Sequence, residues 1–324
     1  MIRRFLPLLA TTVIFLLGYL YCSLQFHNFA TVRVMLNLLT DNAFLGIIAV
    51  GMTFVILSGG IDLSVGSVIA FTTVFLAIAI GHWHLPPLLA FVFALALGAG
   101  FGALMGLCIH YLDIPAFIIT LAGMFLARGV SFLLTTDSLP IDHPFYSQLN
   151  DISLPVMSGR LSLIAMVMLL VFVVGGILAH RTRFGADVFA LGGNLTSARL
   201  MGVPVGRTMV LIYTLSGFLA ALAGIVFSLY TQAGYPLAAT GTEMDAIAAV
   251  VIGGTLLTGG YGYVFGTFIG VLMQGLIQTF ITFDGTLSSW WTKIAVGALL
   301  FAFIGFQRLL LVLWSSKGSA SVPA

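Results

Sequence analysis

The residues in this sequence whose types best suit chemistry are acidic side chains within or beside strongly apolar stretches. Asp62 lies in residues 58–67 near Ser64, and Glu243 and Asp245 open a second apolar stretch. A carboxylate surrounded by hydrocarbon costs about 2.5–3.5 kcal/mol or more, so it usually has a partner or a water-filled pocket. We therefore interpret Asp62, Ser64, Glu243 and Asp245 as candidates for the lining or gate of a polar pathway. The alternative is that the acids only cap helix starts, where they accept bonds from free N–H groups.

The sequence offers little for an enzyme. It holds two lysines, Lys293 and Lys317, and neither follows a glycine-rich phosphate loop, so no Walker A motif is present. The close histidine pair His82 and His84 has no acidic or cysteine neighbour, which does not suit a metal site. We expect no catalytic residue, no metal and no cofactor in this chain. The net charge of +2 is too small to indicate a nucleic-acid partner.

The composition places these residues in a membrane protein. Of 324 residues, 60% are hydrophobic and 7% are charged, whereas an ordinary soluble domain is about 25% charged. Because backbone in lipid must satisfy its hydrogen bonds within each segment, we expect an all-α polytopic fold in one domain, residues 1–324. At about 20 residues per crossing, the apolar runs predict about ten transmembrane helices, near residues 5–24, 43–57, 64–80, 87–109, 115–134, 161–179, 208–229, 244–258, 261–281 and 289–312.

The distribution of positive charge predicts how these helices are oriented. With the N-terminus in the cytoplasm, most arginine and lysine residues fall on the cytoplasmic side, as the positive-inside rule requires. An even number of spans then places the C-terminus in the cytoplasm as well. Residues 180–207 form the longest cytoplasmic loop, and residues 135–160 form a periplasmic loop. The first apolar run lacks a small-residue cleavage site, so we expect a retained span rather than a signal peptide.

An internal repeat links the two acidic regions. Residues 49–70 and 249–270 match without a gap at an offset of 200 positions, and each is an apolar run broken by a Gly-Gly pair. Glycine lets the chain turn or unwind, and interrupted helices at corresponding places in two halves indicate a transport site. We expect a parallel repeat of two broken helices. Two ordinary helical hairpins with glycine-rich turns would give the same pattern.

Residues 190–204 are too polar for a span but carry apolar residues at helical spacing. A Gly-Gly turn precedes Asn194 and Thr196, either of which would cap a short helix that Gly202 closes. Exposed leucine and methionine on a cytoplasmic helix form a docking surface for a partner. The alternative is a helix that lies on the lipid headgroups with arginine anchors.

Four segments together resemble the permease subunit of bacterial monosaccharide ABC importers, the ribose, galactose and xylose class. They are residues 58–67, residues 114–124 with Arg128 and Gly129, residues 182–204 and residues 243–254. The similarity covers nearly the whole chain. Residues 283–293 are similar to one permease of galactofuranose importers, which narrows the resemblance. Tyr261 and Tyr263 depart from the family pattern, because smaller residues are expected beside the glycine between them.

The resemblance implies a permease of the bacterial inner membrane that passes a monosaccharide, here galactofuranose, to the cytoplasm from a periplasmic sugar-binding protein. Its expected partners also include a second permease subunit, identical or not, a cytoplasmic ABC ATPase, and membrane lipid. The cytoplasmic loop would contact the ATPase, and this coupling role is carried onto Gly193, Asn194, Ser197, Ala198, Arg199 and Gly202.

Two other functions remain open. Within the ABC class, a permease for branched-chain amino acids is the nearest alternative. A proton-coupled secondary transporter is a more distant one, and it would use Asp62, Glu243 or Asp245 as a proton relay. A passive channel does not fit, because the sequence has no run of regularly spaced polar residues to line a pore.

Overall fold

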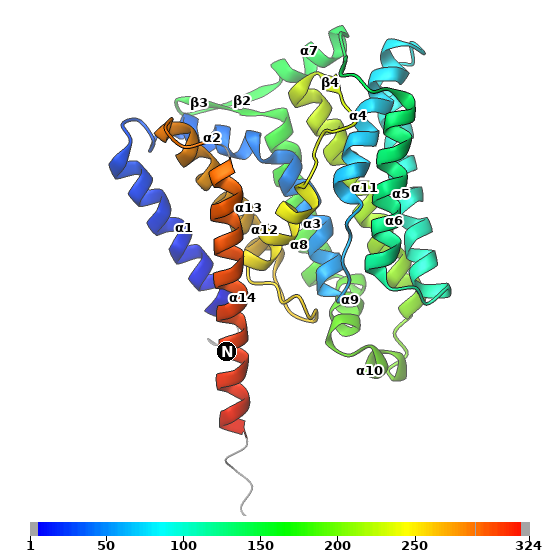
Figure 1. Cartoon of the computed structure of the whole chain (residues 1–324), viewed down its shortest axis with the longest axis vertical. Helices are drawn as coiled ribbons and strands as arrows, with labels where there is room; N and C mark the ends of the chain where they lie inside the picture. The colour runs from blue at the N-terminus through cyan, green and yellow to red at the C-terminus, as the bar shows by residue number, and fades with distance from the viewer. Residues whose placement is uncertain (1–5, 289, 319–324) are drawn as a thin grey trace, which may run out of the picture.

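The computed structural model describes residues 6–288 and 290–318, and most of this part of the chain is helical (Figure 1). The helices are α1 (Leu6–Gln25), α2 (Val32–Asp41), α3 (Ala43–Leu57), α4 (Val65–Gly81), α5 (Pro87–Tyr111), α6 (Ala116–Leu134), α7 (Pro144–Asp151), α8 (Leu163–Arg181), α9 (Arg183–Gly193), α10 (Leu195–Leu200), α11 (Val205–Thr231), α12 (Thr242–Ile252), α13 (Val264–Asp284) and α14 (Trp290–Gly318). The strands are β1 (Leu139–Pro140), β2 (Ser153–Val156), β3 (Gly159–Ser162) and β4 (Ala233–Gly234).

Six of the described helices are long and apolar enough to cross a membrane: α1, α5, α6, α8, α11 and α13. Helices α2 and α3 meet at a bend of 57° and count as a seventh span if they are taken together. Each of the ten apolar runs contains a helix, but α4 has 17 residues and α12 has 11. The total of ten crossings and the cytoplasmic position of both termini remain predictions. Arg3 and Arg4, which contribute to that orientation, lie outside the described residues.

The all-α expectation needs one correction, because residues 135–160 are not a plain loop. Strands β2 and β3 form a short antiparallel hairpin, with Ser153 opposite Ser162. Strand β1 pairs instead with β4, so that Leu139 lies opposite Gly234, nearly 100 residues later. The two ribbons and helix α7 lie at one end of the molecule, and α10 lies at the other (Figure 1).

Helix α11 is the centre of the packing, and it contacts α3, α4 and α5. Its approach to α5 depends on glycine: a Cβ atom added at Gly98 or Gly102 would overlap backbone atoms of α11 at Gly217 or Tyr213. Small residues allow helix backbones to come this close in a membrane, where dispersion contacts hold helices together. Helices α3 and α4, which contact α11, also contact α12, so the two broken helices meet in the packed interior.

Candidate functional site

Both copies of the repeat are broken helices. Helix α3 ends at Leu57 and α4 begins at Val65, while α12 ends at Ile252 and α13 begins at Val264. The second helix of each copy, α4 or α13, begins at the corresponding position to within one residue, given the offset of 200. The second copy stops five residues earlier than the first, so residues 253–263 form a longer break and the expected helix over 244–258 is shorter than predicted. Glycine explains the longer break. Gly254, Gly259 and Gly260 have φ values of +92°, +82° and +74°, which other residues rarely adopt.

Asp62 holds the first break together. Its side chain is fully buried, and Oδ1 accepts hydrogen bonds from the Ser64 amide (2.9 Å) and the Ser64 hydroxyl (2.6 Å). Oδ2 accepts a third bond from the hydroxyl of Ser216 on α11, at 2.7 Å. Three donors compensate a buried carboxylate for lost water. Asp62 therefore ties the start of α4 to the central helix, and it does not line the cavity described below.

The two breaks and the end of α9 meet in a cluster of glycines, here called the glycine junction: Gly59, Gly192, Gly259 and Gly260. The Gly260 amide donates to the carbonyl oxygen of Leu57 at 2.8 Å, which joins the second break to the end of α3. A Cβ atom added at Gly259 would lie 2.8 Å from the Gly59 nitrogen and 3.0 Å from the Gly192 Cα. The three segments thus touch backbone to backbone, and no side chain separates them.

Helix α9 leads from the junction directly into α10. Asn194 is the N-cap of α10, and its Oδ1 accepts from the Ser197 amide at 2.8 Å. Gly202 closes the segment with φ +79°, so the predicted short capped helix is present. Of the six residues assigned a coupling role, Ala198 is fully buried, whereas Gly193, Asn194, Ser197, Arg199 and Gly202 are exposed. Leu200 and Met201 are the most exposed apolar side chains here, at 84% and 70%.

A cavity of about 810 Å³ lies among α2, the end of α11, the start of α12, α13 and the start of α14. Its polar lining is Asn37, Asp41, Asn42, Thr242, Asp245, Gln274, Gln278, Thr279, Thr282, Thr292 and Lys293, and its aromatic lining is Phe44, Phe227, Tyr230, Phe283 and Trp290. It lies toward the end of the molecule that carries the ribbons, away from α10 (Figure 1). Such a mixture of amides, acids and rings suits a polar, uncharged ligand.

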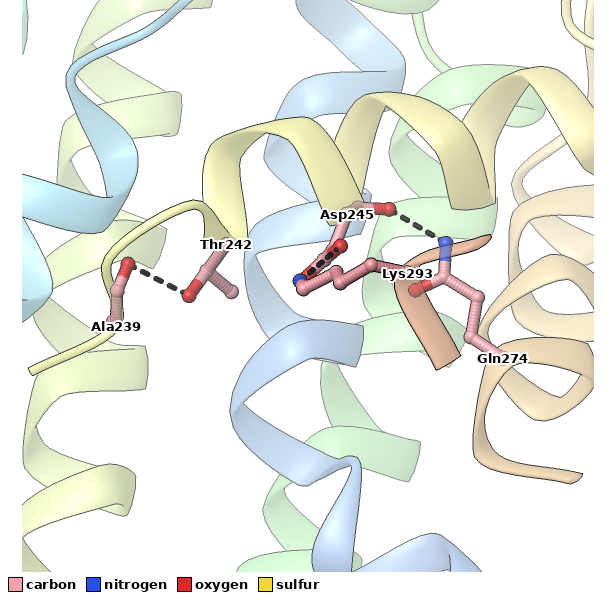
Figure 2. Close-up of polar contacts among 5 residues, drawn as sticks. All are labelled: Ala239, Thr242, Asp245, Gln274 and Lys293. Atoms are coloured by element: carbon pink, nitrogen blue, oxygen red, sulfur yellow. Dashed lines mark hydrogen bonds and ion pairs between the residues drawn. The ribbon is translucent and has the colours of Figure 1, made fainter. Parts of the chain in front are cut away.

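Asp245 is the best anchored polar group of the cavity, as Figure 2 shows. Lys293 donates to both of its carboxylate oxygens, at 2.7 and 2.5 Å. The Gln274 side-chain amide donates to its backbone oxygen at 2.8 Å, and Thr242 donates to the Ala239 oxygen at 2.7 Å (Figure 2). Helices α12, α13 and α14 are therefore pinned to one another at this residue.

The four candidate pathway residues do not converge on one place. Asp62 and Ser64 are bonded to each other, and Asp245 lines the cavity. Glu243 lies two residues before Asp245, which places it on the opposite side of α12. Its carboxylate packs on Gly66 of α4, and its Oε2 is buried without a hydrogen-bond partner among the described residues.

Sequence reasoning missed several residues of these sites. Gln274 had a readable signal, because an amide in the middle of the apolar run 264–284 needs a polar partner. Ser216 had none, since a single serine is ordinary in a membrane helix. Asn37 and Asp41 lie on the short helix before the second span, and only the fold brings them to the cavity.

Comparisons with known proteins find relatives that cover nearly the whole chain. A family model described as "Branched-chain amino acid transport system / permease component" matches residues 34–304. The chain is 64% identical to the inner membrane ABC transporter permease protein YjfF of Escherichia coli (strain K12), over 99% of this chain and 98% of the relative. It is 38% identical to the fructose import permease protein FruG of Bifidobacterium longum (97% and 94% covered) and to the ribose import permease protein RbsC of Escherichia coli (86% of both). No solved structure matches significantly.

Proposed function

The chain belongs to the family described as "Branched-chain amino acid transport system / permease component". Within this family, we propose that it imports the sugar galactofuranose. The chain is a multi-pass inner-membrane permease subunit of an ABC sugar importer, related over nearly its whole length to sugar permeases. The observation that supports galactofuranose is the resemblance of residues 283–293. This segment supplies four cavity-lining residues: Phe283, Trp290, Thr292 and Lys293.

The proposed assembly follows from the two ends of the molecule. A cytoplasmic ABC ATPase docks on α10, where Leu200 and Met201 are exposed next to Arg199. A periplasmic sugar-binding protein delivers its cargo at the opposite end, where the ribbons and α7 lie (Figure 1). A second permease subunit completes the pathway. ATP hydrolysis belongs to the ATPase.

The glycine junction suggests how the two ends communicate. ATP-driven closure of the partner moves α10 and α9, and Gly192 moves with them. The junction joins α9 to both breaks by backbone contact, so this movement of α9 displaces the C-terminal end of α12. The other end of α12 carries Asp245 and Thr242 in the cavity wall. Helix α12 thus links the docking surface to the cavity, and a displacement of the junction moves the cavity wall, as alternating access requires.

A branched-chain amino acid remains the second candidate, because the family model carries that description. The cavity lining favours a sugar. A cation would favour the carboxylate of an amino acid, and the one cation of the described lining, Lys293, is already paired with Asp245.

Uptake by the complete importer tests the substrate. Cells that express this chain with its ATPase and binding protein should accumulate labelled galactofuranose, and excess galactofuranose should compete while leucine should not. Accumulation of leucine that sugars fail to inhibit would overturn the proposed function. A variant of the ATPase that cannot hydrolyse ATP serves as the control for passive entry.

The docking surface gives a second prediction. Met201→Glu places a charge on an exposed apolar side chain of the α10 segment, and we expect co-purification of the ATPase to fall about tenfold. Met157→Glu is the matched control, since Met157 is 90% exposed on the hairpin at the opposite end. Equal ATPase recovery from both variants would remove α10 as the docking site.

A further inference from the structure

We infer that the cavity of about 810 Å³ beside Asp245 is a monosaccharide-binding site within the permease itself. The inference rests on the proposed function and goes further, because it places a specific sugar site inside this single chain. A monosaccharide needs many hydrogen bonds in several directions and an apolar surface for the C–H face of its ring. The cavity supplies both.

The hydrogen-bonding groups of the cavity are arranged in two classes. The first class is already engaged: Asp245 with Lys293, Gln274 with the Asp245 backbone, and Asn42, whose amide donates to the Leu38 oxygen at 2.9 Å. These bonds fix the walls. The second class is available, because the side-chain amides of Asn37 and Gln278 have no hydrogen-bond partner among the described residues, and both residues are exposed and line the cavity. Fixed walls with free amides are what a specific polyol site requires.

Asp41 adds an oriented acceptor. One of its carboxylate oxygens accepts from the Tyr230 hydroxyl at 3.1 Å, which holds the side chain in the cavity wall. The second oxygen remains available for a ligand hydroxyl. A charge-assisted bond of this kind is about twice as strong as a neutral one.

The apolar surface comes from rings at the edge of the cavity. Trp290 is 74% exposed and lies on the first turn of α14, close in sequence to Lys293. Phe283 lines the cavity from the end of α13. Aromatic faces offer large contact areas at little entropic cost. Both rings belong to the segment that resembles galactofuranose permeases, so this wall would set which sugar fits.

The charges of the cavity disfavour anionic ligands. Asp41, Asp245 and Lys293 leave the described lining with one net negative charge. An anion such as a phosphate or a free carboxylate would meet repulsion, and Lys293 is occupied on both Asp245 oxygens. A neutral polyol is compatible with this balance, because it brings no charge that the lining would have to compensate.

Equilibrium binding to the full chain in lipid nanodiscs tests the site. The probe is methyl β-D-galactofuranoside, with D-ribose and D-fructose as comparisons and leucine as the negative ligand. Binding is followed by calorimetry and by tryptophan fluorescence. We expect saturable binding of a sugar, a fluorescence change that Trp290→Phe removes and Trp83→Phe keeps, and about tenfold weaker binding in Gln278→Leu and in Asn37→Leu.

Gln148→Leu is the matched control, because it removes an exposed amide from α7, outside the cavity lining. It should bind as tightly as the unaltered chain. The site is overturned if no sugar binds saturably up to about 50 mM, or if the cavity variants bind as tightly as the control. Uptake by the complete importer distinguishes failure of this site from failure of the proposed function. Sugar uptake without binding in this cavity refutes only the site, whereas import of leucine instead of sugar refutes the proposed function.

Discussion

Gly192→Ala is expected to abolish sugar uptake by the assembled importer. A Cβ atom at this position would overlap the carbonyl oxygen of Leu57 and lie 2.5 Å from the Gly260 nitrogen. All of these atoms are backbone, so no side chain can rotate away, and α9 must separate from both breaks. Overpacking of this kind costs about 1–3 kcal/mol. Uptake and thermal unfolding of the purified chain measure the effect.

The neighbouring glycine provides the control. A Cβ atom at Gly193 would meet nothing within 4 Å, so Gly193→Ala should leave the unfolding temperature unchanged. Full uptake by Gly192→Ala would show that the glycine junction does not transmit motion. Loss of uptake by Gly193→Ala at unchanged stability would instead place an ATPase contact at that exposed residue, as its predicted coupling role requires.

Asp62→Ala is expected to lower the free energy of unfolding by at least about 3 kcal/mol, because each buried donor left without its acceptor costs about 1–3 kcal/mol. The substitution removes the acceptor for three donors and leaves the Ser64 and Ser216 hydroxyls buried without it. The break between α3 and α4 then loses its tie to α11. Uptake should fall with stability, and denaturant unfolding of the purified chain measures the loss.

Two variants make this result specific. Ser216→Ala removes one of the three bonds, so it should cost about a third to a half as much. Asp284→Asn changes a half-buried acid at the end of α13 whose side chain is bonded only to nearby Thr286 among the described residues, and its effect should be negligible. If Asp62→Ala unfolds and transports like Asp284→Asn, then Asp62 acts only as a dispensable helix cap.

Much of the helical framework was predictable because its signals are local. Apolar runs located every long helix, and the run over 43–57 matched α3 at both ends. The Gly-Gly pairs predicted the two breaks, and Asn194 was readable as a cap. Each of these features depends on residues close together in the chain.

The site was less predictable because it depends on contacts between distant segments. Ser216 lies 154 residues from Asp62, and Gly260 lies about 200 residues from Leu57. No local pattern reports such pairs. The early end of α12 was missed for a related reason: residues 253–258 carry no charge that would end an apolar run, but Gly254 within them and Gly259 and Gly260 just after them adopt positive φ on the way to the junction.

The short length of helix α12 has a consequence for the leakage of ions across the membrane. Its 11 residues extend about 16 Å, whereas the hydrocarbon layer is about 30 Å thick. If water enters the cavity at its first turn, this end of α12 is hydrated and the transmembrane voltage drops over the remaining, shorter distance. The electric field over that distance is then steeper, and the Asp245–Lys293 ion pair sits at its edge. A paired charge feels far less force in that field than a lone one, which keeps a thin partition insulating against ions.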